Sequence, residues 1–134
     1  MFGIAPSLAL FSASLLLVAA APASGDPQAL GDPQRGYAVV VRQTSTCTLC
    51  HAGPFPNPHL QGTVGPDLHG VGARLDAGAV RARLVDAAAM NPDTVMPSFG
   101  TVGGRTRVGA QWEGKPILSP QEIEDAVAYL AGLR

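Results

Sequence analysis

The sequence predicts an all-α domain with about three main helices and two long loops, and three observations carry this prediction. Ser119-Pro120-Gln121-Glu122 is a helix-capping sequence that an apolar stripe at helical spacing follows. Asp32-Pro33 is a second helix start, with an aspartate cap and proline at the first helical position. No stretch of the chain shows the apolar and polar alternation that is typical of a strand.

The first 23 residues are predicted to be a secretory signal peptide. An apolar run over residues 8–21 leads to Ala21-Pro22-Ala23, a small-residue cleavage pattern. The run is shorter than the roughly 20 residues that span a bilayer. Because no Lys or Arg precedes Arg35, the usual positive n-region is missing, and an uncleaved anchor is the alternative. Cleavage after Ala23 predicts an exported protein without a membrane segment, with residues 24–31 as a flexible lead-in and 32–134 as one domain.

The charge of the chain argues against nucleic acid as a partner. Nine basic and ten acidic residues give a net charge of −1, and the basic residues form no stripe. We interpret the acidic side chains near the helices as parts of solvated helix faces or as helix caps, and not as a catalytic acid/base pair. These side chains are Asp86, Glu122, Glu124 and Asp125. We therefore predict no catalytic residue.

Each helix has its own apolar face. The first is predicted over Pro33 to Arg42, and the β-branched run Val39-Val40-Val41 makes a strand the alternative on propensity alone. The second is predicted over Asp76 to Met90 and stops at Asn91-Pro92. The third begins at Pro120. The apolar positions expected to be buried are Tyr37, Val40 and Val41, then Val80, Leu84, Val85 and Ala88, then Ile123, Ala126, Val127 and Leu130.

The two loops, Ala52 to Gly65 and Pro92 to Pro116, are long for so small a domain. Few aromatic residues follow the signal segment, and of these we expect Trp112 and Tyr129 in the core. A core this thin and loops this long predict a large rigid cofactor that organises both.

Cys47-x-x-Cys50-His51 holds both cysteines of the chain, and three kinds of chemistry use such a motif. A redox dithiol needs a preceding buried strand, whereas the preceding residues 43–46 are polar. A zinc site would have to add His59 and His69, which lie ten residues apart and would leave His51 idle. Covalent haem attachment uses all three residues, with two thioether bonds and an imidazole at the iron. The sequence favours one covalently bound haem c.

A haem of this kind needs two further groups. The proximal imidazole needs an acceptor for its second nitrogen, and the backbone carbonyl of Pro66 is the candidate. Met96, in a proline-rich loop, is the candidate distal ligand, and a core methionine is the alternative. Met90 is expected to pack, and His59 and His69 to lie in loops. Arg74 and Arg105 are candidates for haem propionates, with a solvated surface position as the alternative.

Four segments carry a resemblance to a known family. Besides the cysteine motif, these are GTVGPDLHGVGARL (62–75), NPDTVMPSFG (91–100) and GKPILSPQEIEDAVAYL (114–130). The chain resembles class I c-type cytochromes, and among them the SoxX family, the monohaem subunits of the periplasmic SoxAX complex of sulfur-oxidising bacteria. Family members commonly place an aromatic residue where Gly100 follows Phe99 here.

The resemblance implies a fold, a ligand set and a partner. The fold is a cytochrome c domain whose loops wrap around one haem. Cys47 and Cys50 bind this haem, His51 is proximal and Met96 distal. The partner is a SoxA-like cytochrome subunit in a heterodimer, which acts as an L-cysteine S-thiosulfotransferase on a thiosulfate-carrier protein. This chain would be its non-catalytic electron-transfer subunit and would pass electrons to a downstream electron acceptor. A free-standing electron-shuttle cytochrome c is the alternative.

Overall fold

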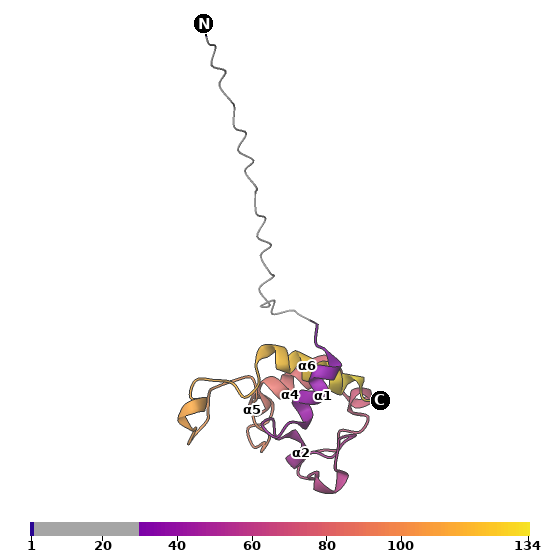
Figure 1. Ribbon diagram of the computed structural model, residues 1–134. Coiled ribbons are helices and arrows are strands. Elements are labelled where there is room, and N and C mark those ends of the chain that lie inside the picture. The colour runs from indigo at the N-terminus through magenta and orange to yellow at the C-terminus, as the bar shows by residue number, and fades with distance from the viewer. Residues whose placement is uncertain (2–29) are drawn as a thin grey trace.

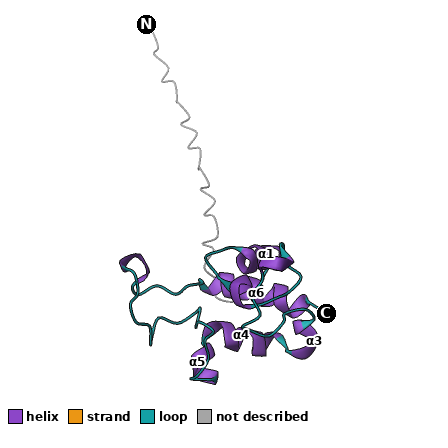
Figure 2. Ribbon diagram, turned by 90° about the horizontal axis from the view of Figure 1, so that it is seen from below, coloured by secondary structure: helices purple, strands orange, loops and turns teal. Residues whose placement is uncertain are grey.

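The computed structural model describes residue 1 and residues 30–134, so the predicted signal peptide lies outside the described residues. Within the described part, helices and loops make up the fold, and no strand occurs (Figure 2). The elements are α1 (Pro33–Val41), α2 (Cys47–Cys50), the 3-10 turn η1 (Pro58–Leu60), α3 (Val71–Arg74), α4 (Ala77–Val85), α5 (Ala87–Met90), the 3-10 turn η2 (Ala110–Trp112) and α6 (Pro120–Gly132). The predicted helical class is thereby confirmed for these residues.

Helix α6 forms as its capping sequence predicts. The Ser119 hydroxyl accepts from the Glu122 backbone N–H, and the Glu122 carboxylate accepts from the Ser119 N–H at 2.8 Å. The four apolar positions expected on one face of this helix are all buried: Ile123, Ala126, Val127 and Leu130. Their burial against α1 and α4 makes α6 the central element of the core (Figure 1).

Helix α1 begins at its aspartate cap and ends one residue before the predicted position. The Asp32 carboxylate accepts from the backbone N–H groups of the first turn, which satisfies donors that would otherwise lack a partner. Val39 and Val40 are buried, whereas Tyr37 is 38% exposed and Val41 is only half-buried. Capping therefore overrides the strand propensity of the valine run.

The close crossing of α1 and α6 depends on small residues. A Cβ atom added to Gly36 would lie 1.9 Å from the Asp125 carbonyl oxygen, and one added to Gly31 would lie 1.9 Å from that of Glu124. Only glycine permits this approach. The aromatic rings of Tyr37 and Tyr129 meet edge to face beside the crossing, with centroids 5.5 Å apart.

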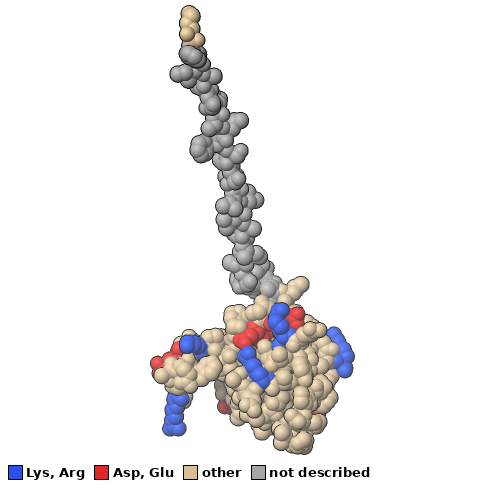
Figure 3. Space-filling view, viewed as in Figure 1, with Lys and Arg blue, Asp and Glu red and all other residues tan. Residues whose placement is uncertain are grey.

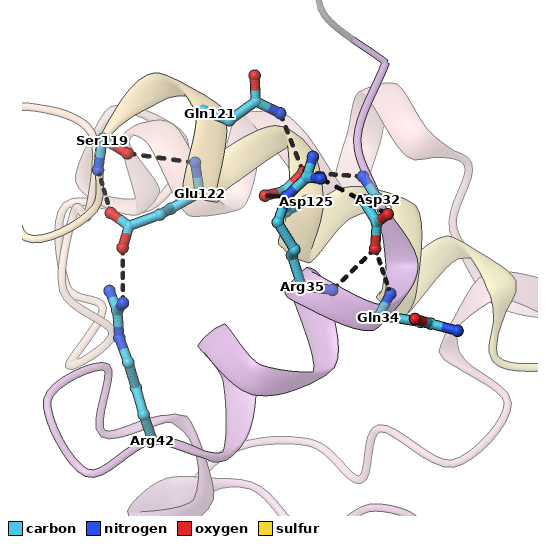
Figure 4. A network of polar contacts seen from close by, with 8 residues as sticks. All are labelled: Asp32, Gln34, Arg35, Arg42, Ser119, Gln121, Glu122 and Asp125. Atoms are coloured by element: carbon cyan, nitrogen blue, oxygen red, sulfur yellow. Dashed lines mark hydrogen bonds and ion pairs between the residues drawn. The ribbon is translucent and has the colours of Figure 1, made fainter.

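The expectation that Asp125 is a solvated residue is wrong. Its side chain is 3% exposed and bridges the two helices, because its carboxylate accepts two hydrogen bonds from the Arg35 guanidinium, through Nε and Nη2, and one from the Asp32 backbone N–H (Figure 4). These bonds, those from Arg35 above all, lower the pKa of Asp125 to about 2 from an ordinary value of 3.8. Glu122 also joins the helices, since its second oxygen accepts from Arg42 at 2.6 Å (Figure 4).

The depressed pKa of Asp125 predicts a specific loss of stability in acid. The carboxylate stabilises the fold fully above pH 3.8, and this contribution of about 2 kcal/mol is lost as the pH falls towards 2. In Asp125→Asn, the free energy of unfolding should decline less between pH 5 and pH 2, by about that amount, in urea titrations followed by circular dichroism. Glu113→Gln removes an exposed carboxylate and should leave the decline unchanged. An equally steep decline in Asp125→Asn would refute this assignment.

The second predicted helix is divided in two. Asp86 ends α4 and caps α5, since its carboxylate accepts from the Ala89 backbone N–H at 3.2 Å and from the Ser98 hydroxyl at 2.7 Å. Asp86 lies within a stretch of sequence that has helical periodicity, yet its carboxylate caps a second helix and does not continue the first. Val80 and Leu84 are buried as expected, whereas Val85 is only half-buried and Ala88, beyond the break, is exposed.

The expectation that Trp112 belongs to the core is also wrong. Its side chain is 44% exposed, because η2 lies on a loop that extends away from the helices (Figure 1). We call this loop, residues 101–116, the arm. Tyr129 does pack against the core, and the ring of Phe55 lies 6.4 Å from its own.

None of the helices in the described part is long and apolar enough to cross a membrane.

Candidate cofactor site

The cysteine motif begins where a buried serine ends α1. The Ser45 hydroxyl is fully buried and lies 2.5 Å from the Val39 carbonyl oxygen and 2.8 Å from that of Arg42. It supplies a donor to carbonyls that the end of a helix leaves without partners. Thr46 then takes a left-handed conformation, with φ of 59°, and turns the chain into α2.

Both cysteines lie on the single turn of α2 as half-buried free thiols. Cys47 packs against the hydrophobic core, and this burial raises the pKa of its thiol. Its Sγ–H donates to the Ser45 carbonyl at 3.7 Å. One turn of helix places Cys47 and Cys50 on the same side, as bonds to one rigid partner require.

A second segment, residues 62–68, lies alongside the cysteine motif and is hydrogen-bonded to it. The backbone N–H groups of Gly62, Gly65 and Leu68 donate to the carbonyls of Thr48, Cys50 and Ala52, at 2.9, 2.7 and 2.8 Å. The donors and the acceptors both advance along the chain, so residues 62–68 lie parallel to residues 48–52. This pairing fixes the position of the motif without a β-sheet.

The His51 side chain is held by residues of this second segment. Its Nδ1 lies 2.6 Å from the Pro66 carbonyl oxygen. A carbonyl only accepts, so Nδ1 carries a proton, and in the neutral form of the ring this tautomer leaves the lone pair on Nε2. Gly65 lies against the ring, and a Cβ atom there would lie 2.4 Å from Cε1. The imidazole is thus oriented from both its edge and its face.

The turn that contains Pro66 is held in place by hydrogen bonds from neighbouring side chains. The Arg74 guanidinium donates to the backbone carbonyls of Asp67 and His69, at 2.5 and 2.6 Å. The Asp67 carboxylate accepts from the His69 backbone N–H and contacts the His69 ring at 2.7 Å. These bonds from His69 lower the pKa of Asp67. Arg74 is exposed, which agrees with the solvated surface position given as the alternative to a propionate contact, and its guanidinium also binds backbone.

Gln61 is a positioning residue that the sequence did not reveal. Its side chain accepts from the Gly53 N–H at 2.8 Å and donates to the Phe55 carbonyl at 2.9 Å, closing the loop after the motif. Phe55, buried against the core, anchors the same loop. Glutamine in a proline-rich loop has no pattern that distinguishes it from a surface residue.

Met96 lies in the other long loop, half-buried and in contact with the core cluster that Cys47 also contacts. The loop is attached to the end of α4, because Phe99 N–H donates to the Leu84 carbonyl at 2.9 Å and Gly100 N–H to that of Val85 at 3.1 Å. A Cβ atom at Gly100 would lie 2.9 Å from Ile123 Cδ1 and 3.1 Å from Val85 Cα, so this end of the loop packs closely against α4 and α6.

The competing interpretations of the motif find less support. A dithiol of the expected kind needs a strand before Cys47, and residues 30–46 contain none. The four side chains of the zinc hypothesis, two of them His59 and His69, do not gather, because no group of three or more His, Cys, Asp or Glu in the described residues is arranged to hold a metal ion. Both histidines are exposed at the surface, as expected, with His59 on η1 and His69 in a turn. Met90 is 51% exposed, so the expectation that it packs is wrong.

The residues present fit a covalent haem. Two free thiols on one helical turn, an imidazole whose Nδ1 donates to a carbonyl, and a thioether at the edge of the same core form a suitable donor set. The structure shows the contact between His51 and Pro66. The ligand roles of these residues, and that of Met96, stay predictions.

Comparisons with known proteins gave one informative result. No family model matches the chain, and no curated protein matches it by sequence. Among solved structures, the crystal structure of SoxXA from P. pantotrophus is similar, with 33% sequence identity and a TM-score of 0.71. The similarity covers 79% of this chain and 84% of the matched chain.

Proposed function

This chain belongs to the SoxX family of class I c-type cytochromes, and we propose that it is the electron-transfer subunit of an exported SoxAX-type L-cysteine S-thiosulfotransferase. The observation that carries this proposal is the geometry of His51, whose Nδ1 is bound 2.6 Å from the Pro66 carbonyl beside two free cysteines. We propose that the segment up to Ala23 is removed on export to the periplasm and that residues 32–134 form the functional domain.

Each residue of the site has a defined part in holding one haem c. The Cys47 and Cys50 thiols would form its two thioether bonds, and His51 Nε2 and the Met96 sulfur would bind its iron. Pro66 fixes the imidazole, since its carbonyl keeps the proton on Nδ1. When bound, such a group supplies a one-electron redox couple.

The cysteine count restricts the role of this chain. Coupling thiosulfate to a carrier thiol forms a sulfur–sulfur bond and releases one proton and two electrons. The sequence holds two cysteines, and both are committed to thioethers in this proposal. The sulfur chemistry therefore belongs to a SoxA-like partner. This chain, with haem bound, would take up the two electrons one at a time and pass them to a downstream acceptor.

The ligand set is tested by its spectrum. Expressed with a cytochrome c maturation system, the protein should carry haem that resists denaturing electrophoresis, and the oxidised form should show a sulfur-to-iron charge-transfer band near the red end of the visible spectrum. Met96→Ala should abolish that band, because it removes the thioether, while the covalent haem remains. Met90→Ala, which changes an exposed methionine, is the matched control and should keep the band.

Two results would overturn this proposal. Absence of covalent haem in the wild-type protein would refute the cytochrome assignment as a whole. A wild-type protein with haem but without the band would refute Met96 as the ligand. A haem protein that transfers electrons yet never associates with a SoxA-like subunit would instead be a free-standing shuttle.

A further inference from the structure

The arm, residues 101–116, projects from the helical body as a separate lobe (Figures 1 and 3). It carries apolar side chains that the body does not cover, since Val102 is 50% exposed and Trp112 is 44% exposed. Together with Arg107 and Val108, these side chains line a shallow open pocket of about 420 Å³. Tryptophan and arginine are among the residues most enriched at the energetic centres of protein interfaces.

The arm is held in its shape by one side chain at its base. The Arg105 guanidinium donates to the carbonyls of Ser98 at 3.1 Å and Lys115 at 2.9 Å, and also to that of Thr101. It thus ties the two ends of the arm together. Further along, the Lys115 ammonium donates to the Gln111 carbonyl at 3.0 Å. A preformed shape lowers the entropy cost of binding a partner.

The charge of the arm is opposite to that of the rest of the chain. The arm holds three of the nine basic residues and one of the ten acidic residues, which gives +2, so the remainder carries −3. Blue side chains stand out on the lobe in Figure 3. Arg107 makes no hydrogen bond or ion pair with the described residues, so its charge is available to a partner. Val102, Val108 and Trp112 form the apolar centre of the pocket, which Arg105, Arg107 and the acidic Glu113 also line. The net positive charge of the arm is complementary to an acidic protein surface.

We propose that the arm is a docking element for an acidic surface of the SoxA-like partner, with Trp112 as its buried anchor and Arg107 as its steering charge. This inference rests on the proposed function for the identity of the partner. The arm begins directly after the Met96 loop, and Arg105 joins the two through the Ser98 carbonyl. A partner seated on the arm is therefore mechanically connected to the loop of the proposed distal ligand.

The test measures binding of purified haem-loaded protein to the SoxA-like subunit of the same organism by surface plasmon resonance. Trp112→Ala should raise Kd about 30-fold or more, mainly through faster dissociation. Arg107→Glu should slow association at low salt and flatten the dependence of affinity on salt. Val102→Asp, which places a charge in the apolar centre, is a second variant that should weaken binding independently of Trp112.

Matched controls lie elsewhere on the surface. Leu60→Ala removes an apolar side chain that is 69% exposed on η1, and Arg83→Glu reverses a charge on α4; both should bind like the wild type. Circular dichroism and the haem spectrum show whether each variant is folded.

The outcomes separate the two proposals. If the wild type does not bind the SoxA-like subunit at all, the partner assignment of the proposed function fails. If the wild type binds and the three arm variants bind equally well, the docking role of the arm is refuted while the proposed function stands. If the haem-loaded protein alone sediments as a dimer that Trp112→Ala dissociates, the occupant is a second copy and the inference is overturned.

Discussion

Gly36→Ala is expected to lower the free energy of unfolding by about 3 kcal/mol or more. The added Cβ atom would lie 1.9 Å from the Asp125 carbonyl oxygen and 2.8 Å from Tyr129 Cβ, so α1 and α6 must move apart. Alanine has a higher helix propensity than glycine, worth about 1 kcal/mol, and this gain opposes the clash. The clash dominates, because the atoms it meets belong to a helix backbone that Arg35 and Asp32 hold through Asp125.

The measurement is a guanidinium chloride titration followed by the circular dichroism of the helices. Gly132→Ala is the matched control, since it makes the same exchange in α6 where a Cβ atom meets nothing within 4 Å. That variant should be as stable as the wild type or more so, by up to about 1 kcal/mol. Equal stability of the two variants would show that the helices do not cross as closely as described.

Gly65→Ala is expected to disturb the candidate site itself. The new Cβ atom would lie 2.4 Å from His51 Cε1 and 2.7 Å from Nδ1, so the imidazole has to rotate away from the Pro66 carbonyl. We expect a loss of about 1–3 kcal/mol in unfolding free energy, because the ring is overpacked and its hydrogen bond is broken. In the haem-loaded protein the reduction potential should rise, because an imidazole that has lost its Nδ1 hydrogen bond is a weaker donor to iron.

Redox titration and thermal unfolding check this prediction together. Gly103→Ala is the control, because that loop glycine has open space around its Cβ position. It should change neither quantity. A Gly65→Ala protein with the wild-type potential and stability would show that the ring does not lie against residue 65.

The presence of helices α1 and α6 was predictable from the local sequence, because the residues that cap each helix lie within a few positions of its first turn. The Asp32 cap and the Ser119 capping box are short-range devices that work as their sequences indicate. The division between α4 and α5 was not predictable in this way. Asp86 caps α5 while bound to Ser98, and nothing in the local sequence shows that Ser98 lies beside it.

The same distinction between local and distant contacts applies to the candidate site. The motif residues Cys47, Cys50 and His51 lie close together in sequence, and Pro66 is only 15 positions from His51. These four residues could therefore be predicted from their spacing along the chain. Asp125 was misassigned because its partners, Arg35 and Asp32, lie about 90 residues away. Trp112 was misassigned because burial depends on whether a loop folds back, and the arm does not.

The pairing of α1 with α6 determines the order in which the chain can fold. The two helices are separated by 119 − 41 = 78 residues, and joining the ends of a loop of that length costs about 4 kcal/mol of chain entropy. Contacts so distant in sequence make folding slow. They also cannot form until Asp125 has been synthesised. Until α6 reaches α1, no core encloses Cys47 and Cys50, so both thiols of the exported, unfolded chain stay accessible for the attachment of a haem.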